Sequence, residues 1–292
     1  MRQFFAITAV DFDIILGMKN KRLLFAVWVV LAAMAASAAV KTEKNVAYAA
    51  LEQCRLDVKW PKGATNFSTV VWFHGGGLSS GSRHFIRLDD SIAQVAVSYR
   101  LLGQNGLTNG AECVRDAAAA VAWTLENIAK YGGNPKKVFV SGMSAGGYLA
   151  MMVGMAPQYL KERGHGLGEL AGLAPISGQA TKHFNVRKFA GDTDPQYLPK
   201  IDALAPLAYC SKDIPPIISI CGEAPWEWKC RSEENRLLIA SCVALGHDKA
   251  WFVSCPFADH DCVFTAGVPY VEMFVQGRIP PVPRFFEGDS PM

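Results

Sequence analysis

Two glycine-containing turns, each directly after a strand-like apolar run, constrain this chain more than any other feature. The first reads HGGG at residues 74–77 and follows the apolar run TVVWF at 69–73. The second reads GMSAG at residues 142–146, between a strand-like run at 137–141 and a helix-like segment at 146–155. It fits G-x-S-x-G, a pattern that carries meaning where a strand precedes it and a helix follows. The pair predicts strands that feed into helices, with a serine exposed above the sheet.

Ser144 is the candidate nucleophile in the second turn. A tight strand-to-helix turn holds such a serine in a strained conformation, and flanking glycines let neighbouring segments approach without a Cβ clash. The hydroxyl then lies at the positive end of the following helix. An ordinary turn serine is the alternative. The strand–turn–helix context, with Gly147 added, favours the nucleophile.

The glycines at 75–77 are candidates for stabilising an oxyanion. Consecutive glycines leave backbone N–H groups free to point at a developing negative oxygen, and each such donor contributes roughly 3–4 kcal/mol to an acyl-transfer transition state. A phosphate-binding loop is the alternative, but the sequence contains no G-x-x-x-x-G-K. We expect His74 to be structural and to orient this loop by hydrogen bonds.

A serine nucleophile needs a base, and the chain has six histidines. His260 follows the strand-like run at 251–255, and a histidine late in the chain suits the order serine, acid, histidine. His247 follows a helix-stop glycine and is expected to be a surface turn residue. His165 and His183 lie in a less regular region and are expected at most to line a substrate pocket. The sequence therefore favours His260 as the base.

The acid is expected in the loop that follows the apolar run at 216–221. Residues 222–231 contain no aspartate, so Glu223 and Glu227 are the two candidates. Glutamate can orient a histidine and stabilise its imidazolium as aspartate does. Asp259 and Asp261 flank His260 and are expected only to shape its loop. The residues alone leave the choice between the two glutamates open.

The fold class is predicted to be α/β, with a mostly parallel central sheet flanked by helices. Strand-like runs alternate with helix-like segments at 112–131, 146–155 and 232–245, and no repeat or proline-rich linker divides residues 39–292. These residues are therefore expected to form one domain, with the strand at 251–255 as its last strand. The irregular stretch 157–210 is expected to be a small cap-like insertion.

Residues 1–38 are predicted to be a leader. A basic stretch at 18–22 precedes an uncharged run at 23–40, and Ala36-Ser37-Ala38 supplies the small residues that signal peptidase needs. We expect translation to start at Met18, a signal peptide at 18–38, and a secreted or periplasmic protein. A retained anchor helix is the alternative, although a membrane span needs about 20 apolar residues.

Charge and cysteine content add two expectations about partners and redox state. The net charge is +3 and no block of Lys or Arg is present, so no nucleic-acid partner is expected. The chain has eight cysteines, none in a C-x-x-C motif or a zinc-ribbon pattern. The sequence also has no H-E-x-x-H motif, no dinucleotide fingerprint and no ligand-spaced cluster, and so no metal or organic cofactor is implied. An exported protein can form disulfides, and Cys255–Cys262 or Cys210–Cys230 could pair.

Five segments together resemble the α/β-hydrolase esterases. They are HGGG at 74–77, SYRL at 98–101, DAAAAVAW at 116–123, GMSAGG at 142–147 and the late His260. The resemblance runs from about residue 46 to residue 275. It is nearest to the hormone-sensitive-lipase-like and feruloyl/acetylxylan-esterase-like (BD-FAE-like) secreted bacterial enzymes.

This resemblance implies an α/β-hydrolase fold and a role for each motif. It implies Ser144 as nucleophile, His260 as base and an oxyanion hole from the N–H groups of Gly75, Gly76 and Ala145. The spacing of the acid loop favours Glu227 over Glu223. The chain departs from the commoner G-x-x-D pattern, which would place aspartate at position 225, where proline stands.

The expected function is a secreted serine esterase with a Ser-His-Glu triad. It would hydrolyse short-chain or plant-polysaccharide-linked carboxylic esters through an acyl-enzyme, with a small molecule or polysaccharide ester as its only expected partner. An arylformamidase-like amide hydrolase and a catalytically inactive hydrolase-fold binding protein are the alternatives. A membrane-anchored interaction protein is a further one, and it requires residues 23–40 to be retained. No stable membrane anchor is expected after signal cleavage.

Overall fold

The computed structural model describes residues 39–228, 230–279 and 285–287. The predicted leader, including Met18 and the uncharged run, lies outside the described residues. Of the helices described, none has the length and apolar character needed to cross a membrane.

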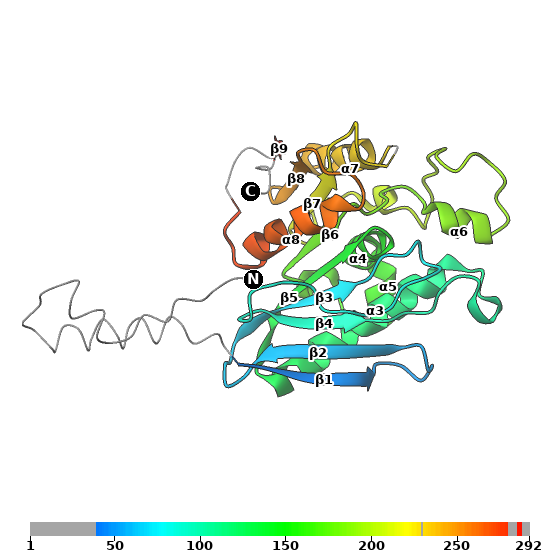
Figure 1. Cartoon of the computed structure of the whole chain (residues 1–292). Coiled ribbons are helices and arrows are strands. Elements are labelled where there is room, and N and C mark those ends of the chain that lie inside the picture. The colour runs from blue at the N-terminus through cyan, green and yellow to red at the C-terminus, as the bar shows by residue number, and fades with distance from the viewer. Residues whose placement is uncertain (1–38, 229, 280–284, 288–292) are drawn as a thin grey trace, which may run out of the picture. The chain divides into compact units, whose positions relative to one another are not determined.

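One nine-stranded sheet organises the fold (Figure 1), in the order β1-β2-β4-β3-β5-β6-β7-β8-β9. The strands β1, β2 and β4 pair antiparallel, and every other pair is parallel. Their bounds are β1 Val40–Ala47, β2 Arg55–Pro61, β3 Phe67–Phe73, β4 Ala93–Val97, β5 Gly133–Met143, β6 Gly172–Ile176, β7 Ile217–Gly222, β8 Ala250–Cys255 and β9 Phe285–Glu287. The inner strands β4, β6 and β7 are buried along their whole length, as parallel strands covered on both faces are.

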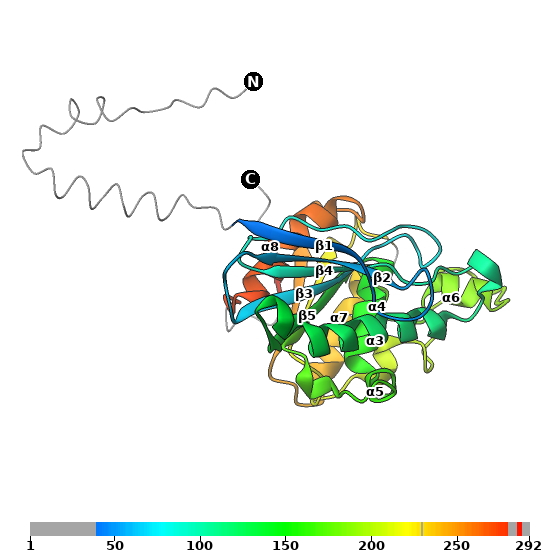
Figure 2. The ribbon, with the colours of Figure 1, turned by 90° about the horizontal axis from the view of Figure 1, so that it is seen from below.

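Helices cover both faces of this sheet (Figure 2). The α-helices are α3 Gly110–Asn127, α4 Ala145–Met155, α5 Pro157–Lys161, α6 Phe184–Phe189, α7 Arg231–Ala244 and α8 Cys262–Val275. Apolar side chains of α3, α4, α5 and α7 belong to one core cluster, and those of α8 belong to a second cluster on the opposite face. The helix α3 begins where the Asn109 side chain accepts a hydrogen bond from the Ala111 N–H, and its run of alanines packs closely against the sheet. The short 3-10 helices are η1 Gln104–Gly106, η2 Ile128–Tyr131, η3 Leu167–Glu169 and η4 Pro206–Tyr209.

The predicted α/β class and mostly parallel sheet are confirmed, and three local expectations are wrong. The strand β6 lies inside the stretch 157–210 that was expected to be a cap, because its five residues GLAPI, with a glycine and a proline, carry a weak strand signal. The strand at Ala250–Cys255 is followed by β9, which pairs parallel with it. His247 is buried rather than on the surface, with Nε2 3.0 Å from the carbonyl oxygen of Ile214.

A long insertion follows β6 and precedes β7, and it holds α6 and η4. Figure 1 shows α6 projecting beyond the carboxyl ends of the strands. The insertion is joined to the glycine turn at 74–77, because the Asn185 side-chain amide donates to the carbonyl oxygen of Gly77 at 2.7 Å. The irregular part of the chain therefore lies beside one of the two turns that constrain the sequence.

Candidate active site

Ser144 occupies the turn between β5 and α4, where the sequence predicted it. Its φ of 56° and ψ of −115° lie outside the regions that non-glycine residues prefer, and its N–H donates to the carbonyl oxygen of Ile176 at 2.9 Å. A Cβ at Gly146 would lie 2.0 Å from the carbonyl oxygen of Phe73, so only glycine allows α4 to start this close to β3. Strain of this kind costs about 1–3 kcal/mol and is found where the surrounding packing enforces it.

His260 and Glu227 complete a hydrogen-bonded chain that begins at Ser144. The Oγ atom of Ser144 lies 2.9 Å from Nε2 of His260, and Nδ1 of His260 lies 2.7 Å from Oε1 of Glu227. The three residues follow β5, β8 and β7, whose carboxyl ends lie at one edge of the sheet. A serine, an imidazole and a carboxylate in this order can remove the serine proton and stabilise the resulting imidazolium.

The buried Glu227 carboxylate forms hydrogen bonds with four groups. Besides His260, the Ser177 hydroxyl donates to Oε2 at 2.6 Å, the Gly222 N–H donates to Oε2 at 3.1 Å, and the Trp228 N–H donates to Oε1 at 2.8 Å. Burial by itself raises the pKa of this carboxyl, but the hydrogen bonds from His260 and Ser177 outweigh burial and lower the pKa of Glu227. The carboxylate is therefore ionised and fixed in orientation at neutral pH.

The turn at 74–77 presents backbone donors next to Ser144. The ideal Cβ position of Gly75 is 3.6 Å from Cβ of Ser144, and Gly76 has a φ of 100° with no room for a side chain against Ser80. Among the backbone hydrogen bonds that the described residues make outside helices and strands, none has the N–H of Gly75, Gly76 or Ala145 as its donor. Ala145 is the first residue of α4, where N–H groups have no acceptor inside the helix. These three N–H groups are available to a negative oxygen near Ser144.

His74 is buried under the same turn. Its Nδ1 lies 2.7 Å from the carbonyl oxygen of Gly75, and its ring stacks on Tyr99 with centroids 4.5 Å apart. Burial lowers the pKa of His74 to about 4, against the hydrogen bond with Gly75, which raises it. A neutral, packed imidazole fits the structural role that the sequence suggested.

Glu223, the alternative acid, lies in a different position. Its Oε2 accepts the Phe257 N–H at 2.8 Å, and its own N–H donates to the carbonyl oxygen of Ala258 at 3.1 Å. Glu223 thus ties the loop after β7 to the loop that carries His260. Among the described residues the structure places Glu227, not Glu223, against the imidazole.

Three further residues belong to this site, of which Ser177 and Trp228 were not singled out by the sequence. Ser177, at a φ of 46°, has its hydroxyl within 3.0 Å of Nδ1 of His260 as well as on Glu227. The Trp228 ring stacks on His260, and the buried Arg231 donates from Nη1 to the carbonyl oxygen of Ser177 at 3.1 Å. A serine in a PISG segment and a Trp in a loop have no signal of their own, because their role depends on which loops meet. Of the described residues, no group of three or more His, Cys, Asp or Glu side chains is arranged to hold a metal ion.

The cysteines are all unpaired. Each of the eight is a free thiol in the described chain, so neither the Cys255–Cys262 nor the Cys210–Cys230 pair is formed. Cys221 and Cys242 are fully buried among apolar residues and pack as small hydrophobic side chains.

Comparison with known proteins finds a matching family model and similar solved structures. The BD-FAE family model matches residues 56–169. A gut-microbiota carbohydrate esterase superposes with a TM-score of 0.67 at 18% identity, covering 84% of this chain and 98% of that one. Esterase 2 of Thermogutta terrifontis with bound propionate superposes with a TM-score of 0.63 at 21% identity, covering 85% and 97%. The chain has the α/β-hydrolase fold.

Two curated relatives match a shorter region of the chain than these structures do. Carboxylesterase NlhH of Mycobacterium tuberculosis is 33% identical over 122 residues, which is 38% of this chain and 36% of the relative. Mouse carboxylesterase 1F is 34% identical over 124 residues, 39% of this chain and 22% of the relative. The match thus covers between about a fifth and about a third of the length of these relatives.

Proposed function

We propose that this α/β-hydrolase is a serine esterase that hydrolyses carboxylic esters through an acyl-enzyme. The observation that carries the proposal is the hydrogen-bonded chain in which Ser144 Oγ lies 2.9 Å from His260 Nε2 and His260 Nδ1 lies 2.7 Å from Glu227. The carboxylesterases among the sequence relatives and the esterases among the superposed structures support the same chemistry.

The reaction follows from the positions of these groups. His260 removes the Ser144 proton as Oγ attacks the ester carbonyl, and the N–H groups of Gly75, Gly76 and Ala145 stabilise the oxyanion. The imidazolium, held by Glu227, then protonates the leaving alcohol. Water enters, His260 removes its proton, and the second oxyanion collapses to release the acid and free Ser144.

The proposed substrates are short-chain esters or esters carried on plant polysaccharides, and the proposed location is outside the cytoplasm. Support for a polysaccharide ester comes from the BD-FAE match and from the superposed structure whose name is carbohydrate esterase. Support for export comes from the basic stretch, apolar run and Ala36-Ser37-Ala38 of the leader sequence.

Hydrolysis of p-nitrophenyl acetate tests the reaction. Ser144→Ala should abolish turnover while circular dichroism stays unchanged, and Ser211→Ala, a serine outside the site, should behave as the parent. Undiminished turnover in Ser144→Ala would refute the nucleophile. A panel of acetylated xylan, methyl ferulate, short p-nitrophenyl esters and N-formylkynurenine tests the substrate. Turnover of N-formylkynurenine alone would replace esterase by amide hydrolase.

A further inference from the structure

Arg231 is a buried cation that forms no ion pair with any described residue. Its exposed fraction is 4%, and its guanidinium donates one hydrogen bond, from Nη1 to the carbonyl oxygen of Ser177. Among the described residues, no carboxylate oxygen lies within 4.0 Å of its nitrogens. A buried charge is costly unless it is paired, because burial removes its hydration. Its remaining donors, Nε–H and the Nη2 hydrogens, therefore need an acceptor that the described residues do not supply.

The two nearest acids are already occupied. Glu227 is bound by His260 and three other donors, as described above. Glu234 accepts the N–H groups of Ala180 and Thr181 at 3.1 and 3.2 Å, and the Thr181 hydroxyl at 2.9 Å. Burial lowers the pKa of Arg231, and the charges of Glu234 and Glu227 oppose that shift without contacting the guanidinium. Neither acid is free to pair with it.

Arg231 opens onto a small surface pocket. The pocket is lined by Gln179, Phe184, Gln196, Tyr197, Arg231 and Glu234. Its volume is about 10 Å³, the room of one water molecule or one carboxylate oxygen. The lining holds one positive and one negative side chain, but the Glu234 oxygens are already bound by three donors, whereas the guanidinium has donors with no acceptor among the described residues. What the pocket offers a ligand is therefore a local hydrogen-bond donor with a positive charge, to which an anionic acceptor binds best.

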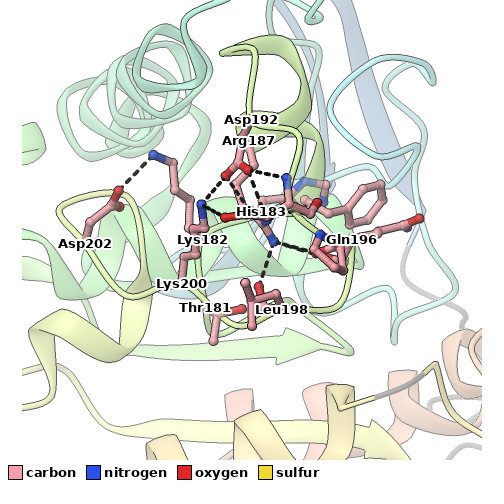
Figure 3. Close-up of polar contacts among 12 residues, drawn as sticks. Thr181, Lys182, His183, Arg187, Asp192, Gln196, Leu198, Lys200 and Asp202 are labelled. Atoms are coloured by element: carbon pink, nitrogen blue, oxygen red, sulfur yellow. Dashed lines mark hydrogen bonds and ion pairs between the residues drawn. The ribbon is translucent and has the colours of Figure 1, made fainter.

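The wall of the pocket is held rigidly by a second arginine (Figure 3). The side chain of Arg187, 3% exposed, pairs with Asp192 at 2.8 Å and donates to the carbonyl oxygens of Gln196 and Leu198 at 3.4 and 2.7 Å. The loop that carries Gln196 and Tyr197 is thus wrapped around a fixed guanidinium. A pocket with such a wall exists before a ligand arrives, which lowers the entropic cost of binding.

Arg231 links the pocket to the catalytic residues. The centroid of the Trp228 ring is 4.4 Å from that of the His260 ring and 6.0 Å from Cζ of Arg231. His183, stacked on the lining residue Phe184, has a fully buried Nε2 with no hydrogen-bond partner among the described residues. Because its Nδ1 accepts the Asn185 N–H, Nε2 carries the proton and is a second donor without an acceptor in this region.

We propose that Arg231 forms an anion subsite that binds a free carboxylate of the ester substrate. Guanidinium presents paired donors that match a carboxylate, and such charge-assisted hydrogen bonds are the strong ones. This inference rests on the proposed function, since it assigns a substrate class to the same site. The preferred esters are those with a second, ionised carboxyl group on the acyl or the alcohol part.

Matched esters test the subsite. One arm uses monoethyl succinate, glutarate and adipate, each against the ethyl ester in which a primary amide replaces the free carboxylate. The other arm uses O-acetylglycolic and O-acetyl-3-hydroxybutyric acids against their amides. In the parent enzyme we expect kcat/KM for at least one acid to exceed that of its amide about tenfold or more. Ratios near one for every pair would overturn the subsite while neutral-ester turnover left the esterase intact.

Variants of Arg231 test whether this residue causes the preference for the acid over its amide. Arg231→Gln should bring the acid-to-amide ratio close to one, Arg231→Lys should keep part of it, and Arg163→Gln, an exposed arginine after α5, should keep all of it. A parental ratio in soluble Arg231→Gln would contradict the assignment. If Arg231→Gln does not fold, an undiminished ratio in Arg231→Lys would contradict the paired-donor geometry.

Binding without turnover separates the two proposals. In the Ser144→Ala background, calorimetry should give a Kd about tenfold lower for the preferred acid than for its amide, and this difference should vanish on adding Arg231→Gln. If the parent hydrolyses no ester but this difference is found, the esterase fails and the anion subsite stands. If esters are hydrolysed and no difference is found, the subsite fails.

Discussion

The indole ring of Trp228 lies flat on the imidazole of His260, with ring centroids 4.4 Å apart and an interplanar angle of 10°. The backbone N–H of the same residue donates to Oε1 of Glu227, so one loop residue contacts both the base His260 and the acid Glu227. The negative face of an indole attracts a cation. The stack is therefore suited to the imidazolium that forms when Ser144 loses its proton.

Replacing this ring should slow the chemistry. We expect Trp228→Leu to lower kcat for p-nitrophenyl acetate by roughly tenfold, because the imidazolium loses a cation–π contact of about 0.5–2 kcal/mol. Trp228→Phe keeps an aromatic face and should recover much of the loss. Equal rates for the leucine and phenylalanine variants would show that the ring acts only by filling space. Trp226→Leu, an exposed tryptophan in the same loop, is the matched control.

The two glutamates of the acid loop should separate cleanly in activity. Glu227→Gln should lower kcat by about 10³–10⁴, since an amide cannot stabilise the imidazolium and favours the wrong tautomer of His260. Glu223→Gln should lower it by less than about tenfold, because Glu223 binds the Phe257 N–H rather than the imidazole. Steady-state kinetics of both variants checks this, and a larger loss in Glu223→Gln would reverse the assignment of the acid.

Ser177 should affect stability in a pH-dependent way. Its hydroxyl helps to lower the pKa of Glu227, so the ionised carboxylate stabilises the fold above the unfolded-state value of about 4.3. That contribution is lost as pH falls through the folded-state pKa. We expect Ser177→Ala to reduce the free energy of unfolding by about 1–3 kcal/mol at pH 7 and by less at pH 3. Urea denaturation at both values measures this, and an equal loss at both would exclude coupling to the charge.

His74 should produce a separate dependence at higher pH. Its pKa is lowered to about 4 in the fold, below the unfolded value of about 6.5, so the unfolded chain binds more protons between these values. Stability should therefore rise with pH across this window, with His74 contributing roughly 3 kcal/mol of the change.

The variant His74→Asn isolates this contribution. It should be less stable at pH 7 and should show a flatter rise between pH 4 and 6.5 in the same urea measurement. A slope identical to that of the parent would mean that His74 is not buried as a neutral imidazole.

The sequence determined those parts of the site that depend on local backbone conformation. Glycines at 75 and 76, and the GMSAGG segment around Ser144, specify turns that few other residues can form, and the alternating apolar runs specify the strands before them. The position of His260 after the strand Ala250–Cys255 was likewise evident from chain order, although β9 then adds an unforeseen edge strand.

Only the tertiary structure shows that Glu227, which the family resemblance favoured, contacts the histidine, and it brought Ser177 and Arg231 to the same place. Glu223 and Glu227 are four residues apart in one loop, and the residue types alone do not separate them, although the spacing in the family resemblance favoured Glu227. The strands β7 and β8 are parallel neighbours, so the loops that follow them meet at one edge of the sheet. In that arrangement Glu227 contacts His260, whereas Glu223 accepts the Phe257 N–H. Contacts between loops depend on sheet order and loop direction, and residues far apart in the chain encode these only jointly.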